Sequence, residues 1–478
     1  MKRLLDARPW RLAARGLARW RARRATLPPF PAWPADDDDP VRAVATLHAR
    51  GAYAEAMTRA ETLLPRLDEL TSRAHAVVTL ARLLIAVGDA RAEPLCRQYL
   101  PLLATTPAGA TLIDSMDLRP HPPRWLPNGA PHLLVTSRAV SAGAMSAAEV
   151  ERLLSSRPDV FIRHPQAHLV MAQAHMVPRP EEAGRALSRF FDAHGVAPVG
   201  LSPGEGSFLA RLRLARRPVV WGRRKVTVMM AAYRATETLS YAIESLLEQT
   251  YRPLEILICD DASPDATPVL LRKRYARCSL PEGIELRLFR SRDNQGPYGI
   301  RNALLAEATG ELITVHDADD LALPERIAEQ VAALDGGHAA SIGRFLRVTE
   351  RGRFVFFGDQ NALRLSVASL LVQRSVLEQC GPYRTVAFGA DHELLQTLRE
   401  RFSIAYLKRP VHLGLWSDQS LTRSEGFESL ESGYRSPARR RYAELVDEQL
   451  RGKVDERRMN DELEALGIGR EPYPIEAL

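Results

Sequence analysis

The sequence has few cysteines and no long apolar run. Its 478 residues include four cysteines, Cys96, Cys259, Cys278 and Cys380, and no two of them form a Cys-x-x-Cys pair. This spacing argues against a zinc site or a disulfide framework and is typical of a reducing cytoplasm. No stretch of about 18 apolar residues is present, which argues against a membrane-spanning helix. We therefore expect a cytoplasmic protein of two or three domains, since a domain commonly holds about 100–200 residues.

Positive charge is concentrated at the start of the chain. The formal net charge is +7, and residues 1–24 hold nine lysines and arginines, one acid, and interleaved leucines and tryptophans. We expect residues 1–39 to form a basic amphipathic arm and a Pro- and Asp-rich linker. The arm is typical of a helix on an anionic membrane surface, peripheral to the inner face of the cell membrane, and equally of a solvated basic segment. Without an aromatic platform or a known motif, the charge does not indicate a nucleic-acid partner.

Helical periodicity dominates residues 40–205. Two helix–turn–helix patterns have their turn glycines, Gly51 and Gly88, about 37 residues apart, which is near the period of helical-pair repeats. The segment 51–56 resembles the turn of a tetratricopeptide-type repeat. We expect an α-helical, repeat-like domain that packs or scaffolds and that could bind a protein partner. The pattern breaks at 107–130, which is rich in Pro and Gly.

Short apolar runs alternate with helical patterns in residues 220–425. Four runs, at 226–232, 254–259, 284–289 and 311–316, each end in polar or acidic residues. This alternation predicts right-handed βαβ units on a mainly parallel sheet. Because open α/β sheets bind ligands at the carboxyl ends of their strands, the pattern predicts a Rossmann-like nucleotide site. Further expected elements are a helix at 323–334, β-like runs at 339–348 and 353–357, a buried run at 367–372, a helix ending near 402, a last strand at 404–407, and a helical tail at 426–478.

The residues at these strand ends resemble the motifs of the family 2 glycosyltransferases, which have the GT-A fold. The stretches that carry the resemblance are Ala231-Ala232-Tyr233-Arg234, Asp260-Asp261, Asn294-Gln295-Gly296, Arg301-Asn302, Asp317-Ala318-Asp319-Asp320 and Ala390-Asp391. They stand in the family's order and cover about 225–425, less than half of the chain. The family often has a late histidine; here His412 lies further back, and its role as a metal or phosphate ligand stays open.

The resemblance implies a nucleotide-sugar site at 220–425. Its first-strand loop would shape the base pocket, and Asp260 or Asp261 can accept a hydrogen bond from a uracil N–H. Arg301 can pair with phosphate as a planar cation, although a solvated helix face is the alternative. UDP is the expected nucleotide by family habit. The expected nucleotide-sugar-binding residues are Ala232, Tyr233, Arg234, Asp260, Asp261, Asn294, Arg301 and Asp317.

Two carboxylates, Asp317 and Asp319, stand two residues apart at a strand end, where an extended backbone turns both to one side. A departing nucleoside diphosphate needs its charge neutralised, and Mg²⁺ or Mn²⁺ prefers oxygen ligands. The resemblance implies that Asp317 touches the ribose and Asp319 the metal. Helix capping is the alternative, and the sequence favours it for Asp320, which precedes residues 323–325.

Sugar transfer requires a base that takes the proton of the acceptor hydroxyl. The resemblance assigns this role to Asp391, at the start of a predicted helix, where helix capping is the alternative. Direct displacement assisted by one base inverts the anomeric centre. His392 is expected to be structural.

These expectations combine into one function with two rivals. We expect a metal-dependent inverting glycosyltransferase that moves a sugar from a nucleotide-sugar, by preference a UDP-sugar, to a glycan or lipid-linked acceptor in surface polysaccharide synthesis. One rival is a non-catalytic scaffold of a polysaccharide assembly complex, against which Asp317, Asp319 and Asp391 together argue. The other is a sugar nucleotidyltransferase, which would carry a Gly-rich loop after its first strand; residues 231–235 contain no glycine.

Overall fold

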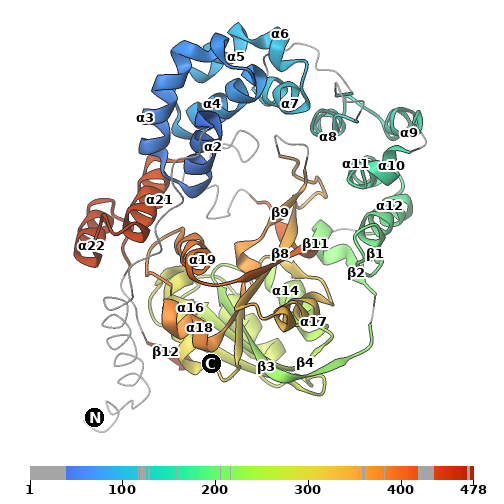
Figure 1. Cartoon of the computed structure of the whole chain (residues 1–478). Helices are drawn as coiled ribbons and strands as arrows, with labels where there is room; N and C mark the ends of the chain where they lie inside the picture. The colour runs from blue at the N-terminus through green and yellow to red at the C-terminus, as the bar shows by residue number, and fades with distance from the viewer. Residues whose placement is uncertain are drawn as a thin grey trace.

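A computed structural model (Figure 1) provides the structure of the protein. It describes residues 39–116, 118, 125–126, 130–157, 159–204, 206–215, 217–357, 361–381, 383–417, 435–470 and 474–478. The predicted basic arm and linker therefore lie outside the described residues except for Asp39. That residue caps helix α2 (Pro40–Arg50), because its carboxylate accepts hydrogen bonds from the backbone N–H groups of Val41 and Arg42.

The first helices form a cluster of their own. Gly51 and Gly88 end α2 and α4 in the left-handed conformation, with φ of 88° and 71°, as the turn pattern predicts. The segment at 107–130 begins with a helix, because Pro107 stands at its first position, where proline is favoured. The helices are α2, α3 (Tyr53–Leu63), α4 (Arg73–Val87), α5 (Ala92–Gln98), α6 (Leu100–Leu103) and α7 (Pro107–Ser115), with the 3₁₀ turn η1 (Leu64–Glu69).

A second group of helices shares its core with the sheet. Phe208 packs edge-on against Phe354 with ring centroids 5.7 Å apart, and both belong to the largest cluster of buried apolar residues. In Figure 1 the two groups of helices form an arc beside the sheet. The elements are α8 (Leu133–Ser141), α9 (Ala147–Ser155), α10 (Val160–Arg163), α11 (Ala167–His175), α12 (Pro180–Asp192), β1 (Val199–Leu201), α13 (Phe208–Arg211) and β2 (Leu212–Leu214).

The main sheet is mixed and mostly parallel at its centre, which confirms the predicted α/β class with a helical region before it. Its order is β12-β5-β4-β3-β6-β10-β8-β11-β7, and the neighbours among β5, β4, β3 and β6 are parallel. The strands are β3 (Val220–Ala232), β4 (Tyr251–Asp261), β5 (Ile284–Ser291), β6 (Leu312–Val315), β7 (Leu321–Ala322), β8 (Ala340–Val348), β9 (Leu363–Leu365), β10 (Leu371–Gln373), β11 (Ile404–Leu415) and β12 (Ile475–Ala477).

Helices cover both faces of this sheet. Side chains alternate along β3, so that Val228 and Met230 belong to one buried cluster and Met229 belongs to another. Helices α14 and α17 share the first cluster, and α16, α18 and α19 share the second. The bounds are α14 (Leu239–Leu247), α15 (Thr267–Leu270), α16 (Gly296–Glu307), α17 (Arg326–Ala332), α18 (Arg374–Cys380) and α19 (Ala390–Arg401), with the short turns η2 (Leu271–Tyr275), η3 (Ala333–Gly336) and η4 (Val367–Ser369).

Three elements differ from the sequence predictions. The predicted β-like run at 353–357 is wrong as a strand, because only Phe354 forms a bridge, to Val348. The last predicted strand is correct in place but continues to Leu415, since β11 pairs with both β8 and β7. The tail holds α21 (Pro437–Leu450) and α22 (Glu456–Ala465), and also β12, which adds an unpredicted antiparallel edge strand to β5. None of the described helices is long and apolar enough to cross a membrane.

Candidate active site

The candidate site lies where the strand order of the main sheet reverses. From β3 the chain passes to β4 on one side, and from β5 it returns to β6 on the other side of β3. The connecting helices α14 and α16 belong to clusters on opposite faces. Ligands of open α/β sheets bind at the carboxyl ends beside such a switch point. The structure thus brings the loop after Ala232 and the acidic turn 317–320 to the same edge.

The loop after β3 presents an aromatic ring. Arg234 has a left-handed backbone (φ 51°), and its N–H donates to Ser263 Oγ at 3.1 Å. Its guanidinium lies 5.3 Å from the centre of the Tyr233 ring, which is 45% exposed. Ala232 is buried and paired with Asp260 of β4. An exposed ring beside a strand end can stack against a nucleobase.

The neighbouring aspartates at the end of β4 differ in what they bind. Asp260 is fully buried; its Oδ2 accepts from Ser263 N at 3.4 Å and lies 3.5 Å from Arg290 Nε. Its Oδ1 has no hydrogen-bond partner among the described residues. Burial raises the pKa of this carboxyl. A buried acceptor without a partner is costly, and an incoming N–H donor removes that cost.

Both carboxylate oxygens of Asp261 accept hydrogen bonds from the protein backbone. They accept from the backbone N–H groups of Gln295 and Gly296, each at 2.9 Å, which holds the start of α16. Burial nevertheless raises the pKa of Asp261 to about 6. Asn294 supports the same turn, since its Nδ2 donates to the Asp261 carbonyl at 3.2 Å. Of the two aspartates, only Asp260 offers an oxygen that is not engaged.

Arg301 joins the acidic turn to α16. Its Nη2 donates to Asp317 Oδ1 at 2.6 Å, and its guanidinium lies beside the rings of Tyr298 and Tyr383, at 5.3 Å and 5.6 Å from their centres. Burial opposes its charge, but Asp317 and the nearby tyrosines and Asp391 hold the pKa of Arg301 above its usual value. Arg301 is 5% exposed, so the alternative of a solvated helix face is wrong.

Tyr298 links this pair to the predicted base. Its hydroxyl donates to Asp391 Oδ1 at 3.0 Å and accepts from Gly389 N at 3.0 Å. Asp391 Oδ1 also accepts from the backbone N–H of His392 at 2.8 Å. The cap residue of α19 is Gly389, so Asp391 lies in the first turn and is not the cap. Tyr298 is not among the site residues predicted from the sequence, although its position three residues before Arg301 places both on one face of α16.

The acidic turn is crowded with negative charge. The backbone of Asp319 is fixed by Tyr241, whose Oη donates to the Asp319 carbonyl at 2.9 Å. Burial, together with the Asp320 and Asp317 carboxylates, raises the pKa of Asp319 well above its usual value. No side chain in the described part of the chain hydrogen-bonds the Asp319 carboxylate. Arg347 opposes this shift, but no ion pair to the Asp319 carboxylate occurs among the described residues.

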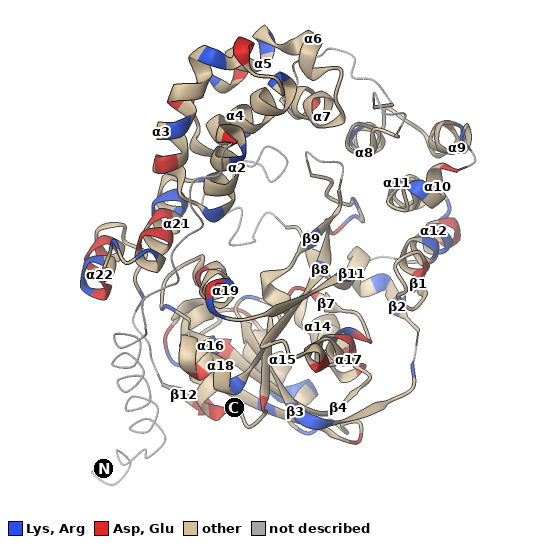
Figure 2. Ribbon diagram, in the orientation of Figure 1, with Lys and Arg blue, Asp and Glu red and all other residues tan. Residues whose placement is uncertain are grey.

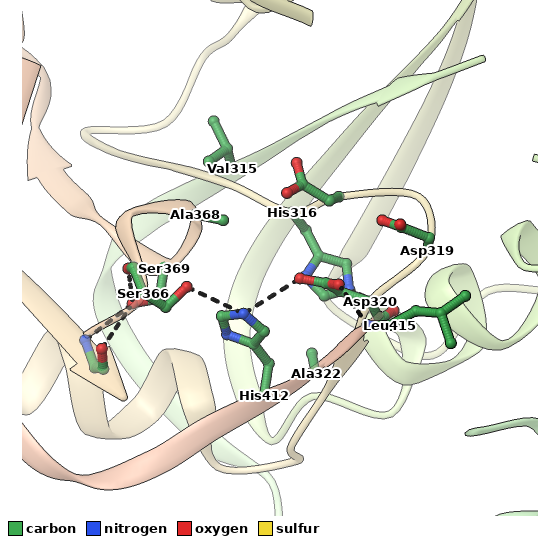
Figure 3. A network of polar contacts seen from close by, with 12 residues as sticks. Val315, His316, Asp319, Asp320, Ala322, Ser366, Ala368, Ser369, His412 and Leu415 are labelled. Carbon is green, nitrogen blue, oxygen red and sulfur yellow. Dashed lines mark hydrogen bonds and ion pairs between the residues drawn. The ribbon is translucent and has the colours of Figure 1, made fainter. Parts of the chain in front are cut away.

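Asp320 does not cap a helix, contrary to the sequence prediction. Its Oδ1 accepts from Leu415 N at 3.3 Å, and its Oδ2 lies 3.2 Å from His412 Nε2 (Figure 3). Helix α17 begins only at Arg326, with Glu325 at the cap position. The strand β7, which pairs with β11, separates Asp320 from that helix.

His412 is buried and contacts other side chains of the protein interior. Its Nε2 lies 3.1 Å from Ser366 Oγ and 3.2 Å from Asp320 Oδ2 (Figure 3). Burial and the nearby Arg326 lower the pKa of His412, so that its imidazole is neutral. Arg326 is itself buried and donates to Val315 O at 2.7 Å and to His316 Nδ1 at 2.8 Å. These contacts fix the end of β6 beneath the acidic turn.

The residues present fit a divalent cation that shares its ligands with a substrate. No group of three His, Cys, Asp or Glu side chains arranged for a metal occurs among the described residues. Mg²⁺ is commonly bound through one or two carboxylates plus substrate phosphates, so a complete protein cage is not required. Asp319, crowded by like charge and without a side-chain partner, has the chemistry of such a ligand.

Comparison with protein families identifies the domain that carries this site. Residues 227–395 match the family model described as glycosyl transferase family 2. The match begins in β3 and ends in α19, so it spans the strand-end loops, the acidic turn and Asp391.

Similar curated proteins are bacterial. EpsE of Bacillus subtilis (strain 168) is 29% identical over 194 residues, which is 40% of this chain and 65% of that protein. The succinoglycan biosynthesis protein ExoO of Rhizobium meliloti is 37% identical over 114 residues, 24% of this chain and 31% of that protein. The UDP-Glc:alpha-D-GlcNAc-diphosphoundecaprenol beta-1,3-glucosyltransferase WfgD of Escherichia coli is 31% identical over 109 residues, 23% of this chain and 40% of that protein. The chain thus covers less than two thirds of the length of each of these relatives.

Among solved structures, the chain is similar to S. aureus TarS 1–349 in complex with UDP-GlcNAc. The identity is 17%, the TM-score is 0.38, and the match covers 51% of this chain and 71% of TarS 1–349. A likeness of this size carries no argument about ligands.

Proposed function

We propose that this chain, whose residues 227–395 match the model of glycosyl transferase family 2, transfers a sugar from a nucleotide-sugar to an acceptor hydroxyl with inversion at the anomeric carbon. One observation carries the proposal. The acidic turn at the switch point and Asp391 are joined through Tyr298 and Arg301, which bridge two carboxylate sites from one helix. A donor and an acceptor bound at these two carboxylates would meet at the same sheet edge.

We propose that the donor is a UDP-sugar. Asp260 Oδ1, buried and without a partner in the described chain, is suited to accept the N–H of a uracil ring. The exposed Tyr233 ring is suited to stack on that base, beside Ala232 and Arg234. Asp261 and Asn294 support the pocket indirectly, because they hold the start of α16. The name of WfgD includes a UDP-Glc donor, which supports the same choice.

Asp319 would hold Mg²⁺ or Mn²⁺, and Asp317 would orient the ribose. When bound, the cation neutralises charge that develops on the departing diphosphate. Arg301 supplies a second, permanent positive charge next to Asp317, and its planar fork suits a phosphate oxygen. The third carboxyl of the turn, Asp320, faces His412 and Leu415, and burial raises its pKa to about 8.

Asp391 is the proposed general base. Both of its described hydrogen bonds, from Tyr298 Oη and His392 N, end on Oδ1. Its Oδ2 is thereby left to accept the proton of the acceptor hydroxyl as the hydroxyl oxygen bonds to the anomeric carbon. The bond from that carbon to the diphosphate oxygen breaks in the same step, and attack opposite the leaving group inverts the centre. His392 stays neutral, since burial lowers its pKa to about 4.

The acceptor is proposed to be a glycan or a lipid-linked sugar in surface polysaccharide synthesis. The names of two relatives support this choice: ExoO is a succinoglycan biosynthesis protein, and WfgD is a transferase acting on a diphosphoundecaprenol-linked sugar. The basic residues at 1–24 support attachment to an anionic membrane surface on the cytoplasmic side. The helices of 40–205 are a candidate surface for a protein partner of the assembly machinery.

Donor turnover tests the proposal. Purified protein, Mn²⁺ and a panel of UDP-, GDP-, dTDP- and CMP-sugars are scored for release of the free nucleotide. Release from one donor, abolished by chelation and by Asp319→Ala but retained in Asp335→Ala, supports a metal-dependent transferase. Asp335 is a matched control because it lies outside the site and its side chain is 79% exposed. No release from any donor, together with no thermal shift on adding nucleotide and Mn²⁺, would favour a scaffold.

A further inference from the structure

The first turn of α19, which carries Asp391, is held from two sides. On one side, Tyr298 Oη bonds both Gly389 N and Asp391 Oδ1. On the other side lies Tyr442 of α21, in the tail that follows the family 2 domain. A Cβ at Gly389 would lie only 2.8 Å from Tyr442 Cε1, so the glycine allows the ring to close against the turn. Gly389 also needs its left-handed backbone, with φ of 84°, to start the helix.

A buried ion cluster fastens this turn to the tail. Glu393 follows Asp391 by two residues and is 4% exposed. Its Oε2 accepts from Tyr442 Oη at 2.6 Å, and its Oε1 accepts from Arg384 Nη2 at 3.0 Å. Burial and the Glu393 charge raise the pKa of Tyr442 well above its usual value, so its hydroxyl remains a donor.

Arg384 extends the cluster into both tail helices. Its Nη1 donates to Glu456 Oε1 of α22 at 2.7 Å, and its Nη2 donates to Gln449 Oε1 of α21 at 3.1 Å. The backbone between Arg384 and Gly389 is paired as well, since Ala387 N donates to Ile468 O at 2.8 Å. The segment before Asp391 is therefore anchored by side chains and by main chain to the same tail.

Helix α21 is fixed on its opposite side by the N-terminal helices. Glu444 Oε1 accepts from Ala54 N at 3.1 Å, and Arg451 Nη1 lies 2.6 Å from Glu55 Oε2. Ala443 belongs to the apolar cluster of α2–α4, although its neighbour Tyr442 belongs to that of α19. Figure 1 shows α21 beside α3, and Figure 2 shows acidic and basic residues along α21 and α22. The tail thus lies between the N-terminal helices and the turn that carries Asp391.

We propose that Tyr442, acting through Glu393 and Gly389, is a positioning residue that fixes the Asp391 carboxylate for proton transfer. The inference rests on the proposed function and extends it to a residue outside the matched domain. Tyr442 closes the turn from the side opposite Tyr298. Loss of its hydroxyl leaves the Arg384 contact of Glu393 in place but removes the hydrogen bond that joins Glu393 to α21, which lets the turn shift. Because a base must lie within hydrogen-bond reach of the acceptor hydroxyl, a shift of about 1 Å can cost up to about 100-fold in rate.

Tyr442→Phe is the test, because it removes the hydroxyl and keeps the ring against Gly389. Tyr406→Phe is the matched control: Tyr406 Oη accepts from Arg399 Nε at 3.0 Å near the far end of the same helix. We expect the kcat of transfer to fall about 10-fold or more in Tyr442→Phe, with the donor KM and the dissociation constant for UDP unchanged. Tyr406→Phe should keep the wild-type kcat.

Hydrogen exchange gives a readout that does not depend on turnover. Backbone amides of 387–393 should exchange faster in Tyr442→Phe than in the wild type, while those of 396–401 should exchange at the wild-type rate. If residues 387–393 of Tyr442→Phe exchange at the wild-type rate, or if its kcat falls while its donor KM rises by the same factor, Tyr442 is not a positioning residue. Either result would leave the proposed function standing. A wild-type protein that turns over no donor would overturn the proposed function, and the kinetic part of this inference with it.

Discussion

Replacing Asp391 by Asn separates the chemistry of this residue from its structural contacts. An Asn side chain keeps Oδ1, the atom that accepts from Tyr298 Oη and from His392 N. It replaces Oδ2, the proposed proton acceptor, by an amide that cannot take a proton. The loss of one negative charge in the first turn of α19 should cost less than about 1 kcal/mol, the range of a charge near a helix N-terminus.

The expected kinetic effect is much larger than the structural one. General-base catalysis contributes about 10²–10⁴-fold, which corresponds to about 3–5 kcal/mol of activation free energy. We therefore expect Asp391→Asn to lose this factor in kcat, measured by release of nucleoside diphosphate in the presence of acceptor. The donor KM and the midpoint of chemical denaturation should stay close to the wild-type values.

Asp455→Asn is the matched control for this variant. Asp455 caps α22, where its carboxylate accepts from Arg458 N at 2.8 Å, and Asn is an equally good cap. This control should retain wild-type kcat and stability. If Asp391→Asn keeps kcat within about a factor of ten of the wild type, Asp391 is not the base. A denaturation midpoint that falls with kcat would instead assign Asp391 a structural role.

Three further predictions concern the surroundings of the site. Arg301→Lys should lower the free energy of unfolding by about 1–2 kcal/mol in chemical denaturation, because an ammonium loses the two flanking aromatic rings; an unchanged midpoint would refute this. Burial raises the pKa of Asp261 to about 6, so its contribution to stability is full below about pH 4 and is lost as pH rises through 6. Asp261→Asn should therefore reduce the decline of unfolding free energy between pH 4 and pH 7, and an unchanged slope would contradict the assignment. Gly310→Ala should destabilise the fold by about 1–3 kcal/mol, because a Cβ would lie 2.6 Å from Thr227 Oγ1, whereas Gly469→Ala, with nothing within 4 Å, should leave the denaturation midpoint unchanged.

The sequence predicts the central strands well because their signal is local. Each of the runs at 226–232, 254–259, 284–289 and 311–316 is a short apolar segment followed by polar residues, and each lies in a strand of the sheet. The parallel order follows from their alternation with helices. The strand β12 has no such signal, since it is a short edge strand that pairs, within the described part of the chain, with β5, almost 200 residues earlier.

The sequence predicts where the site residues lie along the strands, but it does not predict which atoms they contact. Motif order places Asp260, Asp261 and the acidic turn at strand ends, but only the fold shows which oxygens are engaged. Asp320 was predicted to cap a helix because residues 323–325 look like a helix start; the pairing of β7 with β11 overrides that local preference. His412 likewise lies nearly 100 residues after Asp320 in sequence and 3.2 Å from it in space.

The contacts of α16 explain how these separate strand ends act as one site. Asp261 holds the first turn of this helix through two backbone N–H groups. In the same turn Tyr298 reaches Asp391, and in the next turn Arg301 reaches Asp317. Residues three apart on a helix share a face, so the spacing of the two carboxylates is set by one rigid element. Asp261 was predicted from the sequence to contact the nucleotide. Through the helix whose start it holds, it therefore affects both the proposed donor position and the proposed acceptor position.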